Sequence, residues 1–179
     1  MPDTPVFIDP ATFLEGQLTF ILCNDAQGML GWFIKWYTKG NYCHAMLTRK
    51  PMWICTQNDL YKEIPIAGYL TNSEGLKFWR INNLTPGEFS LINDKITADI
   101  AAPWWRRMYN YLGLLGQALH IPGISMPGQD ICSQRVASYL RLLPRLQWII
   151  PSNPSPADLD RIFTANPSLM TCIGYYWQD

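Results

Sequence analysis

Two residues of the chain, His44 and Cys132, could together perform nucleophilic catalysis. Residues 42–48 are predicted to form a strand that carries His44, and Cys132 falls in the first turn of a helix predicted to begin at Asp130. The positive end of a helix dipole stabilises a thiolate, so we expect the pKa of Cys132 to lie well below the roughly 8.5 of a free thiol. With the imidazole as base and the Cys132 backbone N–H in an oxyanion hole, this pair suits acyl-transfer chemistry.

Each of these two residues also has a purely structural interpretation. A single cysteine on the apolar face of a helix usually serves packing, and a single histidine in a strand is usually a hydrogen-bonded core residue. The other histidine of the chain, His120, ends a helical stretch just before Pro122, where an imidazole suits the negative end of the helix dipole. Residue types alone therefore leave catalysis and packing open.

Composition predicts one domain whose balanced charges do not favour a highly charged partner such as nucleic acid. The chain has 179 residues, of which 48% are hydrophobic, and this is enough for one sizeable core. The 14 lysines and arginines balance the 14 aspartates and glutamates, so no global field attracts nucleic acid. We expect a single domain over residues 1–179, with residues 1–14 as an N-terminal extension.

The number and spacing of the cysteines and the composition of the N-terminus lead to expectations about metal binding and cellular location. The 5 cysteines are odd in number and form no C-x-x-C pair, which argues against a disulfide framework or a zinc ribbon. Neither a metal nor a cofactor is expected. The N-terminus lacks a basic region followed by a long apolar stretch, and no apolar run is long enough to span a bilayer. We expect a cytoplasmic protein, unless it is exported by lysis or as part of a virion or secretion system.

The elements that must position His44 and Cys132 follow from hydrophobic periodicity and turn signals. Helices are predicted at 29–37, across 94–119 with a break at Pro103, from an N-cap at Asp130 to residue 143, and from an N-cap at Ser155 to residue 163. Strands are predicted at 17–23, 42–48, 52–57, 62–66, 76–81 and 169–177.

Five short stretches between about residues 15 and 160 carry a family resemblance, and they are 16–21 (GQLTFI), 40–47 (GNYCHAML), 109–113 (YNYLG), 131–136 (ICSQRV) and 155–159 (SPADL). In this order they resemble the permuted NlpC-like papain families, which are related to the lecithin retinol acyltransferase group. In those families a strand histidine precedes a cysteine that begins a Cys-Ser-Glu/Gln motif on a helix. His44 precedes Cys132-Ser133-Gln134 in the same way.

The resemblance implies both a fold and a set of site residues. The implied fold is α+β: a circularly permuted papain-like (NlpC-like) domain with an antiparallel sheet packed against helices. Cys132 would be the nucleophile and His44 the general base. A third polar residue, which orients the imidazole, would come from the strand after His44, where Gln57 is favoured and Thr56 is the alternative.

We therefore expect a thiol-protease-like hydrolase or acyltransferase that cleaves an amide, ester or thioester bond through an acyl-enzyme on Cys132. The substrate would be a peptide, a peptidoglycan-like peptide or an acyl lipid, with neither nucleic acid nor an integral membrane segment involved. Two alternatives stay open. One is a weakly active or inactive binding or structural module, for example a phage or secretion-system component. The other is a permuted cysteine hydrolase acting on ubiquitin-like or isopeptide bonds.

Overall fold

A six-stranded antiparallel sheet forms the centre of the protein. The computed structural model describes residues 17–24, 29–72, 75–118 and 129–176. The strand order across the sheet is β4-β3-β2-β1-β5-β6, and every neighbouring pair is antiparallel. The strands are β1 (Thr19–Cys23), β2 (His44–Lys50), β3 (Trp53–Gln57), β4 (Tyr61–Pro65), β5 (Leu76–Ile81) and β6 (Met170–Tyr176).

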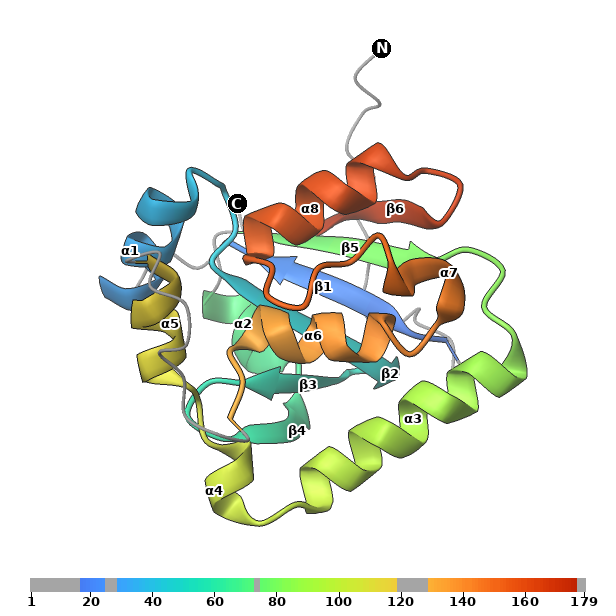
Figure 1. Ribbon diagram of the computed structural model, residues 1–179, viewed down its shortest axis with the longest axis horizontal. Coiled ribbons are helices and arrows are strands. Elements are labelled where there is room, and N and C mark those ends of the chain that lie inside the picture. Colours follow the sequence, from blue (N-terminus) through green and yellow to red (C-terminus); the bar gives the residue numbers. More distant parts are fainter. Residues whose placement is uncertain (1–16, 25–28, 73–74, 119–128, 177–179) are drawn as a thin grey trace.

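Helices cover both faces of this sheet (Figure 1). One face carries α3, α6, α7 and α8, while α2 lies behind the sheet in this view. α1 and α5 flank one end of the sheet, and α4 follows below α5. The helices are α1 (Met29–Thr38), α2 (Ala67–Asn72), α3 (Pro86–Ala101), α4 (Trp104–Arg107), α5 (Tyr111–Ala118), α6 (Cys132–Leu140), α7 (Pro144–Gln147) and α8 (Pro156–Ala165).

The sheet is buried on both faces because its inner strands are apolar at almost every position. In β1, Phe20 and Leu22 pack against α3, α6, α7 and α8, whereas Ile21 and Cys23 belong to the cluster on the α2 side. This alternation is the period of two expected of a strand. A continuous apolar run, rather than an alternating one, is what a strand covered on both sides requires.

The structure confirms most of the predicted elements and corrects several of them. The α+β class with an antiparallel sheet is confirmed, and so is the break at Pro103. The helix expected from 94 begins earlier, at Pro86, because Thr85 and Glu88 form a capping box. Asp130 is not the N-cap of the cysteine helix, since Ile131 holds that position. The predicted extension 1–14 and the residue His120 lie outside the described residues.

Gly40, between α1 and β2, allows the chain to approach α8 closely. A Cβ atom at this position would lie 2.2 Å from the Cβ of Ala157. We expect Gly40→Ala to lower the free energy of unfolding by about 1–3 kcal/mol, because the two chain segments must separate. Denaturant unfolding measures this. Gly87→Ala, where nothing lies within 4 Å of the added carbon, is the matched control, and an equal loss in both variants would contradict the packing argument.

Candidate active site

Cys132 is the first residue of α6, the helix that packs on β2. The preceding residue, Ile131, has extended backbone geometry and its N–H donates to the Oε1 atom of Gln134 at 2.9 Å. This bond satisfies one of the backbone donors that a helix start leaves without an intrahelical partner. The local sequence therefore begins the helix at the cysteine, whose side chain is only 2% exposed.

Several hydrogen-bond donors converge on the Cys132 sulfur. A thiolate there would accept hydrogen bonds from the backbone N–H groups of Ala45 and Ser133 and from the Tyr109 hydroxyl. Ala45 directly follows His44 in the chain, so the sulfur lies at the start of β2, where the histidine also stands. α6 and β2, which lie far apart in the sequence, thus bring Cys132 to the strand that carries His44 (Figure 1).

The acidity of Cys132 is set by two opposing effects. Burial raises its pKa, and the donors from Ala45, Ser133 and Tyr109 oppose that rise without cancelling it, so the pKa lies above its ordinary value. The expectation of a strongly lowered pKa is therefore wrong, because desolvation outweighs the N–H groups at the helix start. The thiol is protonated at neutral pH and needs a base before it can attack.

The imidazole of His44 is held by Thr56 of the neighbouring strand β3. The Nε2 atom of His44 and the Oγ1 atom of Thr56 are 2.7 Å apart. On the other side, the ring of Tyr69 from α2 is stacked nearly parallel to the imidazole, with centroids 6.1 Å apart and planes inclined by 6°. Both the ring plane and one ring nitrogen of His44 are thereby fixed.

Thr56 also belongs to a short chain of hydrogen bonds with Tyr69 and Asn58. The Tyr69 hydroxyl donates to the Oδ1 atom of Asn58 at 2.8 Å, and it lies 3.1 Å from the Thr56 oxygen. The Thr56 hydroxyl lies 3.4 Å from the same Asn58 oxygen, so its proton has acceptors other than the imidazole. This arrangement leaves the threonine oxygen able to accept the Nε2–H of His44, and in that tautomer the basic lone pair is on Nδ1.

Tyr69 also links the histidine to the cysteine. Burial raises the pKa of Tyr69, and the charges that Cys23 and Cys132 would carry raise it further. Cys132 is therefore near enough to the tyrosine, which stacks on His44, to act on it electrostatically. Tyr69 thus contacts both His44 and Thr56 and lies within electrostatic reach of Cys132.

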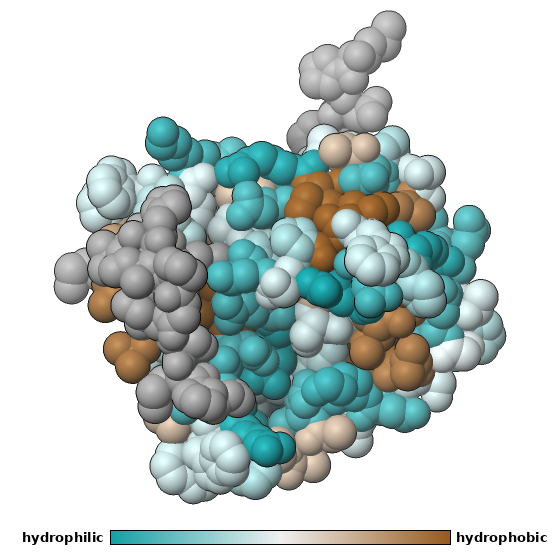
Figure 2. All heavy atoms as spheres, in the orientation of Figure 1, coloured by the Kyte–Doolittle hydropathy of each residue, from teal (hydrophilic) through white to brown (hydrophobic). Residues whose placement is uncertain are grey.

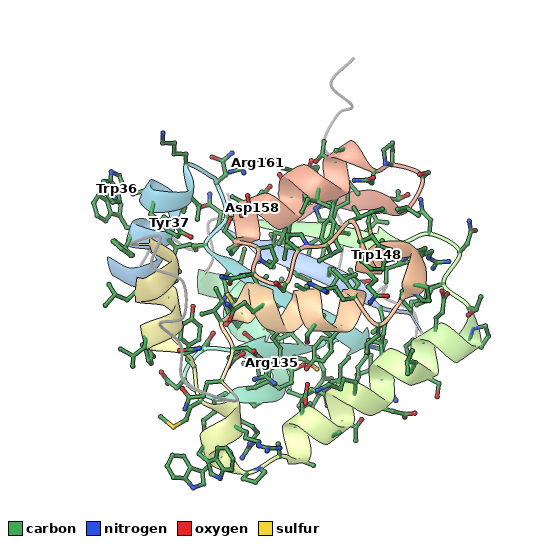
Figure 3. The ribbon with its side chains drawn as sticks, in the orientation of Figure 1. Trp36, Tyr37, Arg135, Trp148, Asp158 and Arg161 are labelled. Atoms are coloured by element: carbon green, nitrogen blue, oxygen red, sulfur yellow. The ribbon has the colours of Figure 1, made fainter. Side chains whose placement is uncertain are left out.

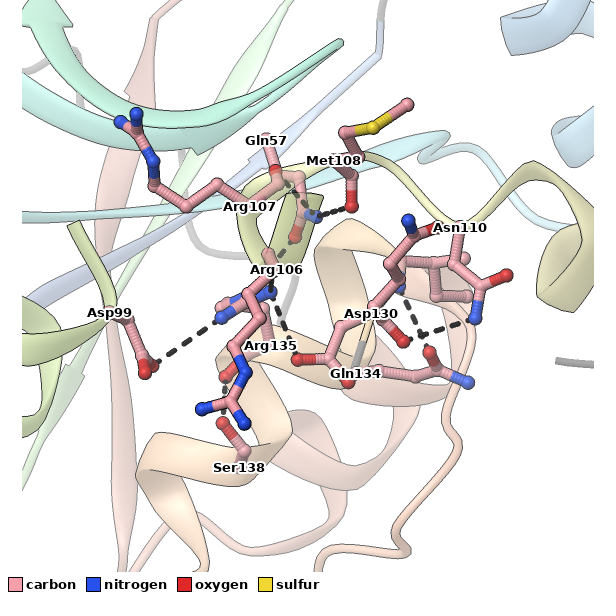
Figure 4. A network of polar contacts seen from close by, with 12 residues as sticks. Gln57, Asp99, Arg106, Arg107, Met108, Asn110, Asp130, Gln134, Arg135 and Ser138 are labelled. Atoms are coloured by element: carbon pink, nitrogen blue, oxygen red, sulfur yellow. Dashed lines mark hydrogen bonds and ion pairs between the residues drawn. The ribbon is translucent and has the colours of Figure 1, made fainter. Parts of the chain in front are cut away.

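Gln57 points away from His44 and Thr56, to the opposite face of the sheet. Its Oε1 atom accepts from the Nε atom of Arg135 at 3.2 Å, and its Nε2 atom donates to the carbonyl oxygen of Met108 at 3.0 Å (Figure 4). Side chains alternate along β3, so when Thr56 turns toward His44, Gln57 faces the α6 side of the sheet. The preference for Gln57 over Thr56 as the orienting residue is corrected by this geometry.

The Gln57 side chain belongs to a buried network around Arg135, which is 6% exposed. This guanidinium pairs with Asp99 of α3 at 3.5 Å and with Asp130 at 3.2 Å (Figure 4), and it lies over the ring of Tyr61. Figure 3 shows Arg135 projecting from α6. The network connects α3, β3, β4 and α6. The role of this network is therefore structural.

Sequence reasoning assigned no role to Tyr109, Tyr69 or Asn58. Tyr109 is buried among Cys43, Cys132 and other apolar side chains, and its pKa is raised by burial and then by Cys132. Asn58 follows Thr56 by two residues, a spacing typical of polar turns. Tyr69 lies in α2, a short helix that no periodicity predicted, so no signal in the sequence could have placed it.

The described residues contain no group of three or more His, Cys, Asp and Glu side chains placed to hold a metal ion. Across the same ranges, no helix has both the length and the apolar character needed to cross a membrane. The titratable side chains that interact with Cys132 include the phenols of Tyr109 and Tyr69.

Comparison with known proteins gives a likeness of fold. No protein-family model matches the sequence, and a search of curated proteins found no significant match. Among solved structures, the crystal structure of metalloprotein yiiX from Escherichia coli O157:H7 (DUF1105) is similar, with a TM-score of 0.59 and 12% sequence identity. The match covers 93% of this chain and 100% of that chain. At this identity the likeness concerns the fold alone.

Proposed function

We propose that this protein is a cysteine-dependent hydrolase or acyltransferase, with Cys132 as nucleophile and His44 as general base. One observation carries the proposal. The Cys132 sulfur lies at the start of α6 against the N–H of Ala45, and the residue before Ala45 is His44, whose ring is fixed by Thr56 and Tyr69. A nucleophile, a base and a group that orients the base are the parts that acyl transfer needs.

The first half of the reaction forms the acyl-enzyme. Nδ1 of His44 takes the thiol proton while the sulfur attacks the carbonyl carbon of an amide, ester or thioester. The negative charge that develops on the carbonyl oxygen is stabilised by backbone N–H groups at the start of α6. The C–N, C–O or C–S bond then breaks, and the leaving group departs with the proton from His44.

The second half regenerates the enzyme. Water, or an acceptor alcohol or amine, attacks the thioester carbonyl and gives its proton to Nδ1, and the sulfur leaves and recovers a proton from the imidazolium. Thr56 keeps the Nε2–H of His44 in place throughout, and its hydroxyl stabilises the imidazolium that forms in each half. No step of this scheme requires a metal.

The chain order of the elements supports a circularly permuted papain-like fold for this site. The base on β2 comes first, the orienting residue on β3 second, and the nucleophile at the start of α6 last. In the resemblance described above, histidine likewise precedes cysteine. The antiparallel sheet and the cysteine helix packed against it fit the same proposal.

Acylation of Cys132 tests the proposal directly. The protein is mixed with p-nitrophenyl esters of short and medium-length acids, quenched in acid and analysed by intact-mass and peptide mass spectrometry. The expected result is one acyl group on Cys132, released by hydroxylamine as a thioester would be. Acylation spread over several cysteines and lysines, with no preference for Cys132, would overturn the proposal.

A binding or structural module on the same fold is the second candidate, and one observation favours it. Cys132 is almost fully buried and its pKa is raised, which are properties of a cysteine used for packing. In that case Cys132 would remain unmodified by every ester in the acylation experiment. The same measurement therefore separates the two candidates.

The role of Thr56 as the residue that positions His44 leads to a further prediction. Thr56→Val removes the hydroxyl at nearly constant volume, and we expect kcat for ester hydrolysis to fall about 10- to 100-fold because the imidazole loses its partner. Thr56→Ser keeps the hydroxyl and should restore most of the activity. Steady-state kinetics and thermal unfolding of both variants provide the measurement. If both lose activity equally, packing of the methyl group, rather than the hydroxyl, is responsible.

A further inference from the structure

Two tryptophans on α1 are exposed although they belong to one of the most apolar segments of the chain. Trp32 and Trp36 are 60% and 65% exposed, and their rings are stacked with centroids 6.3 Å apart. On α5, three further side chains face solvent to about half their area: Tyr111 at 51%, Leu112 at 48% and Leu115 at 46%. We call these five residues the α1–α5 face.

The α1–α5 face is the outer side of a layer whose inner side borders Cys132. Ile34 of α1 and Leu114 of α5 belong to the same buried cluster as Cys132 and Tyr109. In Figure 2, hydrophobic side chains show at the left-hand edge of the molecule, where Figure 1 places α1 and α5. A ligand on this face is therefore separated from the nucleophile by the layer that α1 and α5 form.

Basic residues lie around this face, and one acidic side chain, Asp59, accepts a hydrogen bond from the Tyr111 hydroxyl at 3.3 Å. α1, α4 and α5 contain no acidic residue, whereas Lys35 lies within α1, and Arg106 and Arg107 end α4. α4 also carries two more exposed tryptophans, Trp104 at 63% and Trp105 at 45%. The chain as a whole is neutral, so this positive charge is local.

We propose that the α1–α5 face docks onto an anionic lipid bilayer. Amphipathic aromatic side chains beside lysine and arginine are the pattern that inserts at the headgroup level of a membrane. A second copy of this chain fits less well, because a two-fold interface would bring the same basic residues against each other. Among the substrate classes of the proposed hydrolase, on which this step rests, docking favours an acyl lipid.

The docking is tested with vesicles of phosphatidylcholine, alone and mixed with phosphatidylglycerol. We expect the protein to sediment with the mixed vesicles, and to be released by salt because the attraction is partly electrostatic. The double variant Trp32→Ala/Trp36→Ala should bind at least about tenfold more weakly, since two large apolar side chains leave the interface. Trp148→Ala is the matched control: Trp148 is 88% exposed and lies well apart from Trp36 in Figure 3.

Two outcomes overturn the docking proposal. One is the absence of sedimentation with either vesicle, and the other is equal binding by the double variant, by Trp148→Ala and by the natural protein. A self-association in the ultracentrifuge that the double variant abolishes would assign the face to a second copy instead. Cys132→Ser should bind vesicles as the natural protein does. If Cys132 is acylated but the protein does not bind vesicles, the docking proposal alone is rejected. If the protein binds vesicles but Cys132 is not acylated, the proposed chemistry alone is rejected.

Discussion

Cys132→Ser should reduce ester hydrolysis by about 10³-fold or more, the loss that follows when the nucleophile of an acyl-transfer enzyme is removed. The serine oxygen would meet the same N–H groups of Ala45 and Ser133 and the same Tyr109 hydroxyl that surround the sulfur. The buried hydroxyl is therefore hydrogen-bonded, and we expect the free energy of unfolding to change by no more than about 1–2 kcal/mol. Turnover of a p-nitrophenyl ester and denaturant unfolding measure the two effects.

Cys43→Ser is the matched control for this loss. Cys43 is 4% exposed and belongs to the same buried cluster as Cys132, and its sulfur donates to the carbonyl oxygen of Cys23 at 3.6 Å, a bond that a serine can also make. This variant should keep full activity. Equal activity in Cys132→Ser and the natural protein would show that the sulfur at the start of α6 takes no part in catalysis.

The elements that the sequence predicts well are those with a local cause. The predicted strand 76–81 agrees with β5. The predicted N-cap Ser155, which precedes Pro156, begins α8 as expected. The start of α3 was missed, although Thr85 and Glu88 carry a capping-box pattern. α2 is only six residues long, too short for helical periodicity to be visible.

Some features of the candidate site follow from local sequence, and others depend on tertiary contacts. His44 and Cys132 stand out by residue type and predicted element, but the pKa of Cys132 depends on how deeply α6 packs against β2. The choice between Thr56 and Gln57 depends on which face of β3 meets the histidine, and Arg135 decides it by holding Gln57. Register and packing depth arise from contacts between distant segments, so a local pattern does not contain them.

His44→Ala should lower kcat/KM for ester hydrolysis by about 10²- to 10⁴-fold, the usual contribution of a general base. The raised pKa of Cys132 makes this dependence strong, because almost no thiolate is present at neutral pH unless the imidazole removes the proton. The natural protein should require neutral His44, so its activity should fall as the pH drops through the titration of the imidazole. In His44→Ala the remaining activity should rise with pH up to and beyond pH 9 as the thiol itself ionises.

Alkylation by iodoacetamide gives an independent measurement of the same ionisation. A thiol whose pKa is raised in the folded state is protonated below that pKa, so Cys132 should be labelled more slowly in the native protein than in the unfolded protein at about pH 8. The rate in the native state should climb with pH and show no plateau near pH 6. His120→Ala, which changes the other histidine of the chain, should leave hydrolysis and labelling unchanged. A plateau near pH 6 that disappears in His44→Ala would instead show that a thiolate–imidazolium pair exists before substrate binds, and His44 would then serve as its counter-ion rather than as a base.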